Sequence, residues 1–167
     1  MLKALEETGA CRRGYFVDGL GGAQFALPGA VDRLRAYVDD VEAGERSVVL
    51  AATDPANPYG ASLPWPERSH AGAGHRAGRK AGALVVLVGG RLCLYVEKGG
   101  KRLLSFDEDP ETREKAVRAL VAAARAGWTG RLEPQWLDGE ALRGSDLEAI
   151  LLEAGFRADY RGFALRA

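Results

Sequence analysis

The densest group of side chains that could bind a ligand in this 167-residue sequence is basic. Residues 68–102 hold eight Lys and Arg and a single acidic residue, whereas residues 1–67 and 103–167 are both net acidic. Such a cluster suits nucleic-acid phosphates, because each contact releases a condensed counterion. The predicted phosphate contacts are Arg76, Arg79, Lys80, Lys98, Lys101 and Arg102.

Two aromatic residues near this basic segment suit the same chemistry. Tyr59 and Trp65 lie in the proline-rich stretch PANPYGASLPWP that precedes it. Exposed aromatic rings beside cations stack on unpaired bases, so both join the predicted nucleic-acid-binding set. A second interpretation stays open, in which the cations form an ordinary solvated surface and the two rings pack in the core.

Carboxylates are the candidates for catalysis. Asp54 ends an apolar run that reads as a buried strand, and Asp159 lies in the last predicted hairpin. These two are the predicted acid–base residues, although an Asp-Pro pair such as Asp54-Pro55 is also a common turn former. His70 and His75 lie in a small, basic stretch without carboxylate or thiolate neighbours, so we predict no metal site.

The overall composition bounds the class of protein. The 23 basic residues equal the 23 acidic ones, so a net charge of zero hides the basic middle of the chain. The longest uncharged apolar run, residues 83–88, is too short to cross a bilayer, and we expect no membrane partner. Cys11 and Cys93 have no zinc-ligand spacing, and the N-terminal residues lack the apolar core of a signal peptide. We therefore expect a cytoplasmic protein.

The elements that must position these residues fall into two predicted domains, of which the first is residues 1–45. Leu2 and Leu5 favour a short helix, and Gly21-Gly22 favours a tight hairpin turn. The apolar spacing over residues 30–42 predicts a second helix. A helix, a hairpin and a helix in this order are typical of the end of a winged-helix unit.

Residues 46–167 are predicted to form an α+β domain. A buried strand over 47–54 and a glycine-punctuated meander over 83–106 predict a curved antiparallel sheet or partial β-barrel. Helix-start signals at Asp109 and Ser145 predict two flanking helices, and residues 156–167 read as a closing C-terminal hairpin. Residues 67–82 lack any apolar period, and we predict that they form a mobile basic loop.

Four stretches of the sequence resemble the far C-terminal region of the bacterial large helicase-related (Lhr) family. They are GYFVDGLGGAQFALPGAVDRLR, VVLAATDPANPYGASLPWP, GRKAGALVVLVGGRLCLYVEKGG and LLEAGFRADYRGFALRA, and the resemblance extends over nearly the whole chain. It implies a fragment or relative of very long superfamily 2 ATP-dependent DNA helicases tied to DNA repair. ATP and magnesium are then expected only in the helicase motor of the parent family, and no cofactor is expected in this chain.

The resemblance also implies a likeness to winged-helix DNA glycosylases, in which tandem winged helices are closed by a β-barrel. Those enzymes carry a paired-glutamine motif, which Gln24 and Gln135 cannot form. Three functions stay open. The chain is a DNA-binding and scaffolding module, or part of a glycosylase that uses Asp54 or Asp159, or an assembly module. The expected partners are DNA, the upstream helicase and winged-helix domains and, for the assembly module, another copy of the chain.

Overall fold

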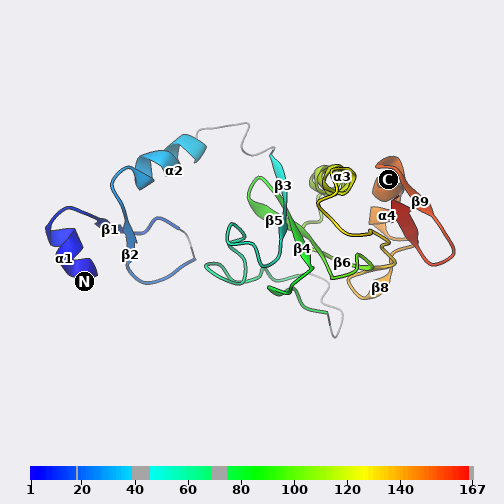
Figure 1. The fold of residues 1–167 in the computed structure, drawn as a ribbon, viewed down its shortest axis with the longest axis horizontal. Helices are drawn as coiled ribbons and strands as arrows, with labels where there is room; N and C mark the ends of the chain where they lie inside the picture. The colour runs from blue at the N-terminus through cyan, green and yellow to red at the C-terminus, as the bar shows by residue number, and fades with distance from the viewer. Residues whose placement is uncertain (18, 39–45, 69–74, 166–167) are drawn as a thin grey trace. The chain divides into compact units, whose positions relative to one another are not determined.

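The computed structural model describes all residues except 18, 39–45, 69–74 and 166–167. The chain divides into two compact units, Met1–Glu45 and Arg46–Ala167. Each unit is drawn in Figure 1 and is considered by itself below.

The smaller unit consists of two helices and a hairpin. Helix α1 spans Leu2–Glu7, strands β1 and β2 span Arg12–Gly14 and Gln24–Ala26, and helix α2 spans Ala30–Val38. The strands pair antiparallel, and the Gln24 side chain closes their connection by accepting hydrogen bonds from the backbone N–H groups of Phe16 and Val17, both at 2.8 Å. Among the described residues of this unit, Cys11 is the only buried hydrophobic side chain. The predicted helix, hairpin and helix are present.

The larger unit is built on an open six-stranded sheet in the order β3-β4-β5-β6-β7-β8. Its strands are β3 (Ser47–Ala51), β4 (Leu84–Val88), β5 (Arg91–Val96), β6 (Arg102–Ser105), β7 (Trp136–Leu137) and β8 (Glu140–Ala141). Neighbouring strands are antiparallel except β6 and β7, which are parallel. The predicted α+β class and the meander are confirmed, whereas the short β7–β8 hairpin and the parallel pairing were not predicted.

Two helices and a separate two-stranded hairpin at the C-terminal end complete the larger unit, as predicted. They are α3 (Pro110–Arg125), α4 (Asp146–Glu153), and β9 (Phe156–Ala158) paired antiparallel with β10 (Phe163–Leu165). Asp109 caps α3, because its side chain accepts hydrogen bonds from the Thr112 hydroxyl and backbone N–H. These two bonds lower the pKa of the Asp109 carboxyl below its usual value. None of the described helices is long and apolar enough to cross a bilayer.

Both faces of the sheet are covered, and this explains the continuous apolar sequence of β4. Val86 and Val88 pack with α3 and α4, whereas Val85 and Leu87 pack on the opposite face with residues from the segment 52–65 (Figure 1). A strand buried on both faces has no polar alternation. Cys93 also faces the helices, and burial raises the pKa of its thiol to about 12, so it is protonated at neutral pH.

Candidate nucleic-acid interface

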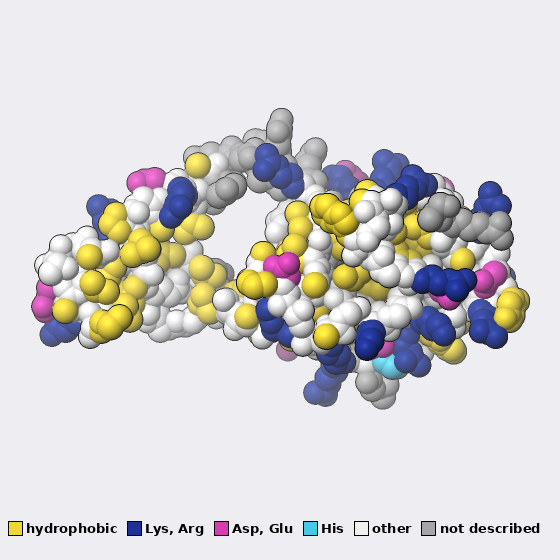
Figure 2. Space-filling view, in the orientation of Figure 1, with side chains coloured by type: hydrophobic (Ala, Val, Ile, Leu, Met, Phe, Trp, Pro, Cys, Tyr) yellow, Lys and Arg dark blue, Asp and Glu magenta, His cyan; other side chains and the backbone are white. Residues whose placement is uncertain are grey.

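One end of the sheet collects most of the predicted phosphate contacts. Strands β4, β6 and β7 begin at this end and β5 finishes there, so the loop before β4 and the β5–β6 turn lie next to each other. The side-chain stem of Lys98 lies against Gly82 of that loop, where an added Cβ would be 3.1 Å from Lys98 Cγ. We define the basic end as the exposed residues Arg76, Lys80, Lys98, Lys101 and Arg102. In Figure 2, Lys and Arg side chains lie along the lower edge of the larger unit, and others lie at its upper edge.

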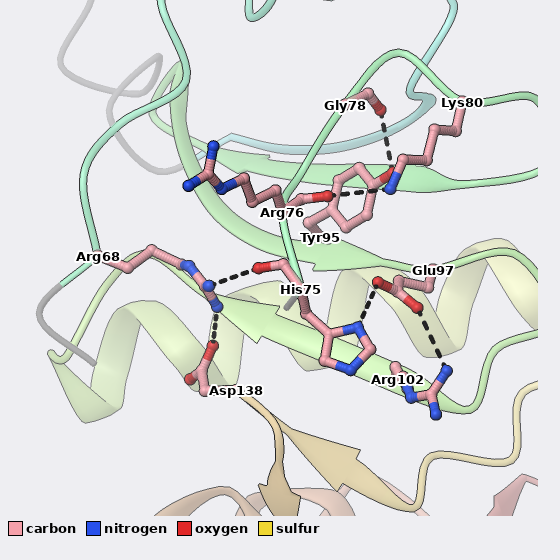
Figure 3. A network of polar contacts seen from close by, with 9 residues as sticks. All are labelled: Arg68, His75, Arg76, Gly78, Lys80, Tyr95, Glu97, Arg102 and Asp138. Carbon is pink, nitrogen blue, oxygen red and sulfur yellow. Dashed lines mark hydrogen bonds and ion pairs between the residues drawn. The ribbon is translucent and has the colours of Figure 1, made fainter. Parts of the chain in front are cut away.

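A small polar network organises this surface (Figure 3). Glu97, the single acidic residue between 68 and 102, lies 3.3 Å from His75 Nδ1 and 3.9 Å from Arg102 Nη1. Both contacts are partly open to solvent, so they contribute little to stability. Their effect is to hold His75 and Arg102 beside one another on the same face of the sheet. His70, the other histidine, lies outside the described residues.

Arg79 differs from the other predicted phosphate contacts because its guanidinium points into the protein. It donates hydrogen bonds to the carbonyl oxygens of Asn57 at 2.8 Å and of Thr53 and Asp54 at 3.0 Å. A half-buried guanidinium that donates to several backbone carbonyls is a structural group, since most of its N–H donors are already used. Arg79 therefore fixes segment 53–59 over the sheet, and we do not include it in the basic end.

The described part of the predicted mobile loop is likewise anchored to the sheet. The Tyr95 hydroxyl donates to the Gly78 carbonyl at 3.0 Å, and Arg68 donates to the His75 carbonyl at 2.8 Å. Arg68 also forms an ion pair of 2.7 Å with Asp138, and both side chains are largely buried. The same carboxylate accepts the Ser105 backbone N–H at 3.0 Å, so it joins residue 68 to β6. Residues 69–74 lie outside the described part of the chain.

Tyr59 is buried in the core and Trp65 is half-buried against it, as the second interpretation proposed. Tyr59 is buried, and its hydroxyl accepts a hydrogen bond from the Leu92 N–H at 3.2 Å. Its ring stacks on Trp65 at a centroid distance of 6.2 Å, and Trp65 meets the Tyr95 ring edge-on at 5.8 Å. The expectation that both rings are exposed beside the cations is therefore wrong for Tyr59, and Trp65 is only partly open, because the proline-rich segment folds over the sheet.

An exposed aromatic residue that the sequence analysis missed lies at the basic end. Trp136, the first residue of β7, is 42% exposed and is in register with Arg102 of the neighbouring strand. The sequence does contain a signal for this element, because Asp138-Gly139 is a typical two-residue hairpin turn. Both residues have positive φ, 54° and 95°, as such a turn requires.

The two candidate carboxylates lie in different surroundings. Asp54 accepts a hydrogen bond from the Ala56 N–H at 2.8 Å, which is the turn-forming alternative considered from the sequence. Asp159 accepts the N–H groups of Arg161 and Gly162 at 2.8 and 2.9 Å, and it lines a polar pocket of about 250 Å³ with Gln135, Tyr160 and two arginines. In the described part of the chain, the hydrogen bonds of the Asp54 and Asp159 carboxylates have no partner residue in common. The described residues also contain no group of three or more side chains suited to a metal ion.

Comparison with known proteins assigns the chain to a family. Residues 1–46 match the winged-helix domain of the large helicase-related protein. A protein of Mycolicibacterium smegmatis named "Lhr helicase/ probable uracil glycosylase" is 48% identical over 176 residues. The Escherichia coli K12 protein named "Lhr helicase/uracil glycosylase" is 38% identical over 165 residues. The chain belongs to the Lhr family and corresponds to a C-terminal region of its members.

These two alignments cover 99% and 97% of the Lhr segment but only 12% and 10% of the relatives. The winged-helix match accounts for residues 1–46 alone. The basic end lies wholly within Arg46–Ala167, outside the matched domain. What this part of the Lhr segment does must therefore be inferred from its own residues.

Proposed function

We propose that this Lhr segment is a DNA-binding module of an Lhr-type helicase and that the basic end contacts DNA phosphates. The observation that carries the proposal is the gathering of five exposed cations at one end of the sheet, from the loop before β4 and from the β5–β6 turn, which lie against each other at Gly82 and Lys98. A localised positive surface attracts a polyanion even when the net charge of the protein is zero. The winged-helix match of residues 1–46 supports the same class of ligand.

Replacing Lys80, Lys98 and Lys101 together by alanine tests the proposal. We expect the slope of log K against log salt concentration to become shallower by about 1 for each phosphate interaction that the substitutions remove, and the affinity to fall for all sequences alike. The measurement is fluorescence anisotropy with a labelled oligonucleotide at several salt concentrations. All three lysines are exposed, so thermal unfolding should change little.

A matched control removes the same charge elsewhere on the larger unit. Arg91 lies at the opposite end of the sheet, Arg118 on α3 and Arg157 on β9, and all three are exposed. Their combined replacement by alanine should leave the salt slope largely unchanged. Equal losses of affinity in the two triple variants, or binding that does not depend on salt, would show that the basic end is not the surface that binds DNA.

A second candidate function is base excision, favoured by the pocket around Asp159 and by the names of the two similar proteins. In this proposal a flipped base enters the pocket, and the Asp159 carboxylate stabilises the oxocarbenium-like transition state or activates water. Asp159→Asn keeps a carbonyl oxygen for the two backbone N–H groups, so the turn should survive. We expect the variant to bind a uracil-containing strand normally and to lose its excision, measured by alkaline cleavage. Asp54→Asn is the parallel control, and excision that persists in Asp159→Asn would refute this assignment.

A further inference from the structure

Trp136 is an exposed aromatic residue on strand β7, which pairs with β6 on one side and β8 on the other. Large aromatic side chains are usually buried because their apolar area is costly to leave in water. Trp136 nevertheless keeps 42% of its surface exposed, while its strand neighbour Leu137 packs against the core between the sheet and the helices. A tryptophan held at the surface in this way is a candidate for contact with a ligand.

The backbone fixes Trp136 beside the basic end. The N–H groups of Gln135 and Trp136 both donate to the Lys101 carbonyl oxygen, at 2.8 and 3.2 Å. Trp136 and Arg102 occupy paired positions on β7 and β6, so their side chains emerge on the same face of the sheet. The ring is therefore held next to Arg102 and Lys101 by strand pairing, and its position does not depend on a flexible loop.

Two other exposed aromatic residues of the larger unit are less suited to a ligand at this surface. Tyr160 is 86% exposed, but the Arg161 guanidinium lies over its ring at 5.0 Å. Trp128 is 79% exposed just beyond the end of α3, away from the paired strands that carry the cations. In the described part of the chain, no cation lies over the ring of Trp136.

We propose that Trp136 stacks on an unpaired base and so makes the basic end a site for single-stranded nucleic acid. This proposal rests on the proposed function, because it takes the cations as phosphate contacts. An aromatic ring flanked by cations offers both a stacking surface and a track for the backbone of a single strand. A duplex hides its base faces in the stack, so the ring adds affinity only for the unpaired form.

The test compares Trp136→Leu with Trp128→Leu in the 167-residue chain, using a single-stranded oligonucleotide and a blunt duplex of the same length. We expect Trp136→Leu to weaken single-strand binding about 5- to 100-fold and to leave duplex binding unchanged. Trp128→Leu should change neither. Trp136→Phe keeps a smaller ring and should retain part of the preference, and circular dichroism checks that each variant folds.

The outcomes separate this proposal from the one on which it rests. If the triple lysine variant loses salt-dependent binding but Trp136→Leu leaves single-strand binding intact, the stacking proposal is wrong. The proposal that the basic end contacts DNA phosphates is then retained. Equal losses of affinity for the single strand and the duplex also overturn stacking, since they indicate a general contact. If the triple lysine variant binds as well as the parent chain, the proposed function itself fails.

Discussion

Replacement of Gly100 by alanine is expected to destabilise the larger unit by about 2 to 5 kcal/mol. Two independent costs add at this position. Gly100 has a φ of +68°, a left-handed conformation that disfavours any side chain. An added Cβ would also collide with the Arg131 carbonyl oxygen and would lie 3.1 Å from Leu132 Cα. Both neighbours are backbone atoms, which cannot move without displacing the segment that leads into β7.

Alanine substitutions at two other glycines distinguish the conformational cost from the cost of the close backbone contact. Gly99 has a φ of +89° with nothing within 4 Å of an added Cβ, so Gly99→Ala should show only the conformational cost, about 1 to 2 kcal/mol. Gly130 has equally open surroundings and lies outside the left-handed region, so Gly130→Ala should be close to neutral. Urea unfolding of the three variants gives the comparison. Equal effects at Gly99 and Gly100 would show that the close backbone approach is not what matters.

Asp138→Ala is expected to cost about 3 to 5 kcal/mol, because it leaves the Arg68 guanidinium buried without its partner. The Arg68 side chain is only 8% exposed, and that of Asp138 is 18% exposed. The substitution also removes the acceptor of the Ser105 backbone N–H. An uncompensated buried charge is the main cost, and the unpaired N–H adds to it. Chemical denaturation of the variant measures the change in stability.

A double-mutant cycle shows whether the ion pair itself is responsible. Arg68→Ala combined with Asp138→Ala should cost less than the sum of the two single substitutions, because the double variant leaves no unpaired charge. Asp138→Asn keeps an acceptor for Ser105 and tolerates the positive φ, so it should lie between the parent and Asp138→Ala. Additive effects in the cycle would contradict a coupled pair.

The sequence predicted those features of the larger unit that depend on local patterns. The meander followed from apolar runs separated by Gly89-Gly90 and Gly99-Gly100, and α3 followed from its cap at Asp109. The direction in which each side chain points was harder to predict, because it depends on contacts with residues distant in sequence. Arg79 and Lys80 are adjacent, yet the Arg79 guanidinium binds carbonyls of segment 53–59 while Lys80 faces solvent.

The burial of the aromatic side chains was also hard to predict from the sequence. Tyr59 lies among prolines and glycine, a composition typical of exposed loops, but its segment covers one face of the sheet. Trp136 lies in a strand of only two residues, too short for any period to reveal. The turn signal at Asp138-Gly139 was the only local indication of that strand, and the parallel partner of β7 was not encoded in any nearby pattern.

The parallel pairing of β6 with β7 has a consequence for how this surface assembles. Lys98, Lys101 and Arg102 surround one β-turn, so their charges are close together as soon as a local hairpin forms. Trp136 reaches them only after the chain has passed through α3 and returned, and we expect this long-range contact to form after the local turn. An incompletely folded chain would thus attract polyanions without telling single strands from duplexes, and discrimination between the two would itself report that folding is complete.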